Sequence, residues 1–302
     1  LLTFGVLLAM VVYMLDATIA NVALPHMQAS LGATFDTITW VLTSYIIALA
    51  VATPITGWLS DWIGSRRLFL IAVGGFVLFS MACGASTNLG EMVLFRFLQG
   101  MMGAFIGPLS QTAMLDINPP SRQSRSMAVW GMGIMIAPIM GPIIGGWLTE
   151  SYNWRWVFYV NLPVGLVSFV LIWLFLPSRP LARRSFDLFG FAVLAIALSS
   201  LQLMLDRGTD QDWFESSEIW IEAIVAASAI WVFIVHLFTG KNTIIHLGLI
   251  KNSNMAMALL FQLIIGLMMM SVMALMPPLL QRVYGYDVLD TGILLAPRGI
   301  GI

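Results

Sequence analysis

The chain has 302 residues, of which 59% are hydrophobic and only 10% are charged, and its formal net charge is −1. A soluble domain carries roughly 25% charged residues, so no water-soluble fold of this length could bury so much apolar surface. The near-neutral charge gives no reason to expect a nucleic acid as a partner. The single cysteine, Cys83, excludes a disulfide within the chain.

Ten apolar segments follow one another along the sequence, and each complete segment is long enough to cross a bilayer as a helix. Helices are required because lipid cannot satisfy exposed backbone hydrogen-bonding groups. The sequence therefore predicts an all-α integral membrane protein, and because both ends fall inside apolar segments we expect a chain truncated at both ends. The expected spans are 1–24, 38–60, 68–87, 91–115, 126–149, 155–176, 187–206, 218–239, 256–280 and the start of one at 291–302.

Basic residues are divided unequally between alternate loops. Lys and Arg collect in the cytoplasmic loops of membrane proteins, so the richer set of loops is expected to face the cytoplasm. This assignment places the N-terminus in the cytoplasm. The poorer loops carry Arg155, Arg207 and Arg282, and the richer loops carry Arg66, Arg67, Arg122, Arg125, Arg179, Arg183, Arg184, Lys241 and Lys251.

Two charged residues lie within expected spans, where charge is costly and usually marks a function. Asp16 lies nine residues before Pro25, at a depth of about 13 Å, and Arg96 lies seven residues after Leu89, at about 10 Å. The two opposite charges are thus at similar depth, and we predict that they face one interior cavity. A static pair that locks two helices is the alternative.

The carboxyl group of Asp16 is the natural candidate for a proton carrier. Burial favours the neutral form of a carboxyl group, whereas a nearby arginine favours the ionised form. These opposing effects predict a group that takes up and releases protons, with Arg96 as its partner in proton coupling. The residues predicted to lie near this site are Tyr13, Asn21, Gln99, Gly100 and Gly103, several of which share a helix face with one of the two charges.

The turn between the second and third spans has the sequence from Gly57 to Arg67. Its glycines permit a tight turn, and Asp61 can accept hydrogen bonds from a helix N-terminus or from arginines. One interpretation is a turn that only sets topology, and the other is a charge latch that opens and closes during transport. The residues of this predicted gating motif are Gly57, Asp61, Gly64, Arg66 and Arg67.

Small residues recur every four positions along the fifth span, which gives that helix one smooth face. Pro138 and Pro142 each remove a backbone donor and are expected to bend it. Such a helix fits a sliding contact between two bundles, and plain close packing is the alternative. The residues of this motif are Gly133, Ala137, Gly141, Pro142, Gly145 and Gly146.

Several motifs of nucleotide binding, metal binding and nucleophilic catalysis are absent from the sequence. There is no phosphate-binding GxxxxGK[ST] loop, no HExxH, no paired-cysteine motif and no GxSxG. We therefore expect neither an enzyme nor a metal site, and no cofactor beyond a proton gradient. A membrane-embedded enzyme would require clustered His, Asp or Ser groups near one interface, and a purely structural protein would leave Asp16 and Arg96 without a purpose.

Six segments resemble motifs of the major facilitator superfamily, in particular its EmrB/QacA-type drug:proton antiporters. The similarity runs through essentially the whole chain. One departure is Trp62, at a place where the family commonly has a basic residue, which puts one contact of the latch in doubt. The matching segments are Leu15 to Pro25, Gly57 to Arg67, Arg96 to Gly100, Gly141 to Gly146, the loop from Leu205 to Phe214, and Leu279 to Gly292.

This resemblance implies fourteen spans, of which about ten are present. It implies an N-terminal six-helix bundle at 1–176, two extra linking helices at 177–240 and the start of a C-terminal bundle at 241–302. It further implies a proton-coupled multidrug exporter of hydrophobic or cationic compounds that works by alternating access in the bacterial inner membrane. Some relatives work with a periplasmic adaptor and an outer-membrane channel. A transporter of one specific metabolite on the same fold is the alternative.

Overall fold

The computed structural model describes residues 1–179, 181–182, 185–240, 243–245, 248, 252–286, 290 and 294. Within these ranges all regular structure is helical, and seven helical segments are long and apolar enough to cross a membrane. These segments are Leu2–Leu31, Asp36–Ile63, Ser65–Ala85, Leu89–Asp116, Trp156–Phe175, Leu188–Arg207 and Ser217–Thr239. The fold class predicted from composition is therefore confirmed, whereas the start of a span at 291–302 lies, apart from Leu294, outside the described residues.

The first helix, α1 (Leu2–Leu31), is longer than expected. The sequence predicted an end near Pro25, but the helix continues through this proline. A proline removes only one hydrogen-bond donor from a helix, and long membrane helices tolerate that loss. The helix ends instead at Gly32, whose φ of 63° is a left-handed conformation that glycine adopts without strain and whose N–H donates to the Gln28 carbonyl.

The second span is built from four short pieces in succession. A reciprocal capping box between Thr34 and Thr37 starts α2 (Phe35–Ile38), and α3 (Trp40–Ala52), η1 (Thr53–Ile55) and α4 (Thr56–Ile63) follow. Gly64 then joins α4 to α5 (Ser65–Ala85) with a φ of 96°. A residue with a side chain would be strained there, so this glycine is required for the tight turn.

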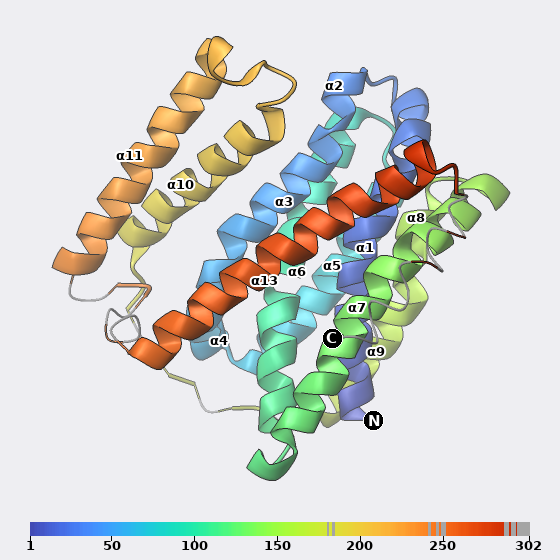
Figure 1. Cartoon of the computed structure of the whole chain (residues 1–302). Helices are drawn as coiled ribbons and strands as arrows, with labels where there is room; N and C mark the ends of the chain where they lie inside the picture. The colour runs from blue at the N-terminus through green and yellow to red at the C-terminus, as the bar shows by residue number, and fades with distance from the viewer. Residues whose placement is uncertain are drawn as a thin grey trace.

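A bundle around α1 forms the core of the molecule. The helices packed against α1 are α6 (Leu89–Asp116), α7 (Pro120–Ser151), α8 (Trp156–Tyr159) and α9 (Asn161–Phe175). On the far sides of this group α3 packs on α6, and α5 packs on both α6 and α9 (Figure 1). Two clusters of buried apolar side chains fill the bundle.

The next two long helices, α10 (Leu188–Arg207) and α11 (Ser217–Thr239), form a hairpin beside the bundle, and α10 packs on α3 (Figure 1). At the contact, the buried hydroxyl of Thr43 donates to Asp206. The loop between the two helices includes η2 (Trp213–Glu215), and Arg207 pairs with Glu218 across it. Most side chains of α11 are exposed in this chain and most of those of α10 are half-buried, as expected of helices that contact lipid on at least one face.

The last long helix, α13 (Ser253–Pro278), is exposed along most of its described length and is followed by the short π-helix η3 (Leu279–Val283). In Figure 1 it runs obliquely, in red, across the view of the bundle. The division of the chain at residues 176 and 240 into a bundle, linking helices and the start of a second bundle stays a prediction.

Candidate functional site

The charges of Asp16 and Arg96 meet inside the bundle. Arg96 Nη1 lies 2.6 Å from Asp16 Oδ2, and both side chains are 0% exposed. The two residues come from α1 and α6, which the sequence separates by 80 positions. Charged donors and acceptors at this distance form strong hydrogen bonds. The structure therefore brings together the two residues that the sequence placed at similar depth.

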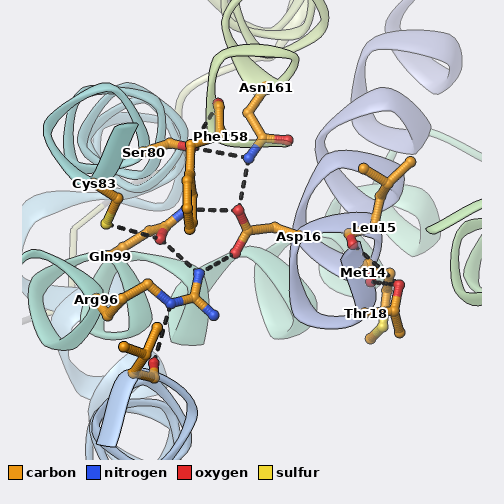
Figure 2. A network of polar contacts seen from close by, with 11 residues as sticks. Met14, Leu15, Asp16, Thr18, Ser80, Cys83, Arg96, Gln99, Phe158 and Asn161 are labelled. Carbon is orange, nitrogen blue, oxygen red and sulfur yellow. Dashed lines mark hydrogen bonds and ion pairs between the residues drawn. The ribbon is translucent and has the colours of Figure 1, made fainter. Parts of the chain in front are cut away.

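Two neutral side chains complete the surroundings of the Asp16 carboxylate (Figure 2). Its Oδ1 accepts one hydrogen bond from Gln99 Nε2 at 2.9 Å and another from Asn161 Nδ2 at 2.7 Å. With Arg96 on Oδ2, the carboxylate thus accepts from three donors on α6 and α9. Hydrogen bonds donated to a carboxylate favour its ionised form. The arrangement stabilises a buried negative charge without solvent.

Arg96 is held by further contacts of its own. Its Nη1 also lies 2.9 Å from Gln99 Oε1, and its Nε donates to the Val41 carbonyl of α3 at 3.3 Å. Its guanidinium carbon lies 4.2 Å from the centre of the Tyr45 ring, a cation–π contact. Arg96 Nη2 has no hydrogen-bond partner among the described residues, and neither does the Tyr45 hydroxyl. Both atoms are buried, so α3 and α6 enclose two donors without a partner in the described part of the chain.

Small residues allow these helices to approach closely at the site. A Cβ on Gly100 would lie 2.5 Å from the Tyr45 carbonyl oxygen, so this glycine sets the separation of α3 and α6. A Cβ on Gly103 would lie 3.2 Å from the ring of Tyr13, which itself packs edge-on against Phe76. Among the predicted neighbours, Gln99 therefore contacts both charged side chains. The other three, Tyr13, Gly100 and Gly103, lie at the helix contacts beside the ion pair. Asn21, in contrast, is exposed on α1 and is not brought into this network.

Sequence reasoning missed three contributors to the site. Asn161 is 1% exposed and Ser80, on α5, is 0% exposed, and Asn161 Nδ2 also donates to Ser80 Oγ at 2.9 Å. The third is Tyr45, the aromatic partner of Arg96. The available signal was a polar residue inside an expected span, but asparagine and serine are uncharged and occur in many membrane helices. Their importance follows from where α5 and α9 meet α1.

The fifth-helix motif packs on α1 beside Asp16. A Cβ on Gly141 would collide with Thr18, and one on Gly145 would lie 2.7 Å from Ile19 Cγ1. Gly133 approaches Leu7, and Ala137 is 0% exposed, whereas Gly146 has no neighbour within 4 Å of its position. The smooth face thus serves close packing within one bundle. α7 runs as one helix through Pro142, and a sliding contact with a second bundle stays a prediction.

The predicted gating motif comprises most of α4, the turn at Gly64 and the first residues of α5. The backbone carbonyl of Asp61 accepts from Ala182 N–H at 3.0 Å, and Arg66 donates to the Trp173 carbonyl at the end of α9. Arg67 is exposed, and Gly57 has no neighbour within 4 Å of its position. The motif is therefore fastened both to the end of α9 and to the segment that follows it. Its role as a latch stays a prediction.

Aromatic contacts extend this fastening. Trp62, which stands where a basic residue is common, is 53% exposed and stacks on Trp58 with ring centres 5.5 Å apart. Trp58 also contacts Phe186, just before α10, at 4.4 Å. Trp62 thus stacks within α4 on Trp58, and it is Trp58 that contacts the segment just before α10.

Asp187, the N-cap of α10, joins three segments near the same end. Its carboxylate accepts from Gly190 N–H and Ile244 N–H and lies 2.9 Å from His236 Nε2 near the end of α11. Burial raises the pKa of Asp187, but the hydrogen bonds from Gly190 and His236, the histidine's charge and the Ile244 N–H bond together lower it below its usual value. This side chain therefore ties α10, α11 and the segment after α11 together.

The fold and the site define a multi-pass helical membrane protein with one sealed network of charge and hydrogen bonds at its centre. Residues 6–302 match the family model described as Major Facilitator Superfamily. The chain belongs to the Major Facilitator Superfamily. The membership that the sequence motifs predicted is thereby confirmed.

Curated relatives give the comparison more detail. The chain is 39% identical over 302 residues to the multidrug export protein EmrB of Escherichia coli (strain K12), covering 99% of this chain and 59% of that protein. It is 38% identical over 300 residues to the fatty acid resistance protein FarB of Neisseria gonorrhoeae, again covering 99% and 59%. The chain therefore spans less than two thirds of the length of these relatives.

Solved structures agree on the fold. The peptide transporter POT in complex with sulfate superposes with a TM-score of 0.57 at 15% identity, over 80% of this chain and 52% of that one. The xylose transporter XylE from E. coli in an inward-open conformation superposes with a TM-score of 0.52 at 14% identity, over 79% and 56%. At such identities the likeness concerns the fold alone.

Proposed function

We propose that this chain carries the proton-coupling half of a multidrug efflux transporter, which exchanges protons for hydrophobic or cationic compounds across the bacterial inner membrane. The observation that carries the proposal is the fully buried ion pair between Asp16 and Arg96. An ionisable pair inside a membrane-spanning bundle is costly and marks ion or proton pathways. The similarity over the whole chain to multidrug export proteins supports the choice of substrate class.

The mechanism is alternating access. In the arrangement described, the carboxyl group of Asp16 is paired with Arg96 and fully buried. Opening toward the outside admits a proton, which neutralises Asp16 and releases Arg96 from its pair as the substrate leaves. Opening toward the cytoplasm lets Asp16 release the proton on that side as the next substrate binds. A carboxylate also attracts cationic substrates directly, so proton and substrate compete for one charge.

The remaining parts of the proposal concern energy, orientation and partners. The proton gradient alone drives transport, without a cofactor, an ATP site or enzymatic chemistry. The N-terminus lies in the cytoplasm, because the loops that carry Arg66, Arg122 and Arg179 are the basic ones. A periplasmic adaptor and an outer-membrane channel are the further partners that the family resemblance implies.

The test is drug efflux driven by an imposed pH gradient in vesicles that contain the full-length protein. Asp16→Asn keeps the size of the side chain but cannot exchange a proton, so efflux is expected to stop. The matched control is Asp36→Asn on α2, whose side chain is exposed. Unchanged gradient-driven efflux by the Asp16 variant would remove this residue from its role.

A narrower substrate range is the second candidate. The name of one relative, a fatty acid resistance protein, indicates that proteins this similar include ones with a defined substrate class. A panel of cationic dyes, neutral antibiotics and fatty acids distinguishes the two. Efflux of several unrelated compounds supports the multidrug proposal, whereas efflux of one class alone supports the narrower function.

A further inference from the structure

Asn161 occupies a special position among the partners of Asp16. It is the first residue of α9, and one residue, Val160, separates it from the short α8. Its Nδ2 lies 2.7 Å from Asp16 Oδ1 and 2.9 Å from Ser80 Oγ, and Ser80 Oγ in turn donates to the Phe158 carbonyl at 2.9 Å. Figure 2 shows this chain leading from Asp16 through Asn161 to Ser80.

The three donors to the carboxylate differ in what they can do when the carboxyl group becomes neutral. A neutral carboxyl carries an O–H and needs an acceptor, but an arginine has only donors. Gln99 has an acceptor, yet its Oε1 faces Arg96 Nη1 at 2.9 Å. Turning this amide would place its NH2 group against the guanidinium. Arg96 therefore cannot accept a hydrogen bond from the Asp16 acid, and Gln99 could accept one only by losing its contact with Arg96.

The amide of Asn161 can turn without placing its NH2 group against a cation at its second partner. The second partner of its amide is the hydroxyl of Ser80, which both donates and accepts. If the amide turns, Oδ1 faces Asp16 and Ser80 in place of Nδ2. The Ser80 hydroxyl can then rotate from the Phe158 carbonyl to donate to Oδ1. Both orientations keep a hydrogen bond between Asn161 and Asp16 and one between Asn161 and Ser80, and the reversed one gives up the Ser80 bond to the Phe158 carbonyl.

We infer that Asn161 is a positioning residue whose amide reverses when Asp16 is protonated, so that it donates to the carboxylate and accepts from the carboxylic acid. The inference rests on the proposed function, in which Asp16 exchanges a proton. The proton stays on Asp16 throughout, and the amide changes only its orientation. Through Ser80, the reversal makes the contact between α5 and α9 depend on the charge state of α1.

Other titratable groups near this network also influence the charge state of Asp16. Among the described residues these are Arg96 from α6, Cys83 from α5, Tyr45 from α3 and Tyr13 on α1 itself. Beside the site, α7 contacts α1 through glycines, and α9 contributes Asn161. The hydrogen bond from Asn161 favours the ionised form because donors to a charged acceptor bind more strongly than donors to a neutral one. Its removal therefore favours the protonated form.

The experiment follows the protonation of Asp16 directly, in the full-length protein in lipid without substrate. The probe is the infrared band of the protonated carboxyl group, assigned by its loss in Asp16→Asn. Asn161→Leu has a similar size but no hydrogen-bonding group, so the midpoint of the titration is expected to move upward by about one pH unit, roughly a tenfold change in proton affinity. Ser80→Ala is expected to move it in the same direction by less.

The band position tests the reversal itself. In the wild type the acid O–H is bonded to Asn161, so in Asn161→Leu the carboxyl band is expected to move to the frequency of a less hydrogen-bonded acid. Asn161→Gln, which retains the amide, should lie nearer the wild type. The matched control is Ser168→Ala on α9, which is equally buried but donates to the Gly5 carbonyl away from the site.

The outcomes separate the inference from the proposed function. A titration midpoint and band position in Asn161→Leu equal to those of the wild type overturn the inference, even if efflux is weaker. A shifted midpoint with an unmoved band overturns the reversal and leaves only a fixed donor. If the wild type shows no proton-driven efflux, the proposed function fails, while the titration of Asp16 still decides the role of Asn161.

Discussion

Gly145 of α7 lies against Ile19 of α1, one helical turn from Asp16, and a Cβ at Gly145 would come within 2.7 Å of Ile19 Cγ1 and 3.2 Å of its carbonyl oxygen. The position of the buried carboxylate thus depends on a helix that contributes none of its hydrogen-bond donors. A shift of α1 away from α7 would also move Asp16 relative to Arg96 and Asn161.

Gly145→Val is expected to destabilise the bundle, because overpacking a close helix contact costs about 1–3 kcal/mol. The measurement is the thermal unfolding of the purified protein, together with gradient-driven efflux. Gly146→Val, one residue along the same helix, is the matched control, since a Cβ there would meet none of the described residues within 4 Å beyond its chain neighbours and the backbone of its own helix. Equal loss in both variants would contradict the packing argument.

The pair of Asp16 and Arg96 can be tested as a unit. Arg96→Leu alone leaves a buried, uncompensated carboxylate and is expected to cost about 3–5 kcal/mol of stability. The double variant Asp16→Asn, Arg96→Leu removes both charges and should recover much of that stability without recovering efflux. Thermal unfolding and efflux are measured on the same preparations. A double variant that transports as well as the wild type would show that the pair is a static lock.

Tyr45 is expected to act through its ring rather than its hydroxyl. The ring centre lies 4.2 Å from the Arg96 guanidinium carbon, whereas the hydroxyl has no partner in the part of the chain that the structure describes. Tyr45→Phe should therefore retain stability and efflux, because a buried group without a partner is removed. Tyr45→Leu should lose the cation–π contact, worth about 2 kcal/mol when desolvated. Similar thermal stability of the two variants would contradict this assignment.

The lowered pKa of Asp187 predicts a pH-dependent contribution to stability. A carboxyl whose folded pKa is below its unfolded value stabilises the fold above the unfolded value, about 3.9, and this contribution is lost as the pH falls through the lowered folded value. Asp187→Asn should therefore unfold at a lower temperature than the wild type at neutral pH, and the difference should shrink in acid. Asp36→Asn is the control, and a difference that is independent of pH would count against the prediction.

Several features of this protein could be read from sequence because they depend on the order of residues along one helix. Among the described residues, hydropathy located seven of the expected spans, since each must present apolar side chains to lipid over about 20 residues. Counting the rise per residue also placed Asp16 and Arg96 at similar depth. The end of α1 was predicted wrongly at Pro25, because the conformation of Gly32 and not the proline ends the helix.

The sequence by itself therefore determined the solvent, the helical class and the two charges that the membrane makes costly. Only the tertiary structure decided which neutral groups satisfy them. Asp16 and Asn161 are separated by 145 positions, and their contact requires α9 to pack on α1 while α5 supplies Ser80. Hydropathy is a property of each segment alone. A hydrogen-bond network depends on how the surfaces of several helices pack together, so it cannot be predicted from the local sequence pattern.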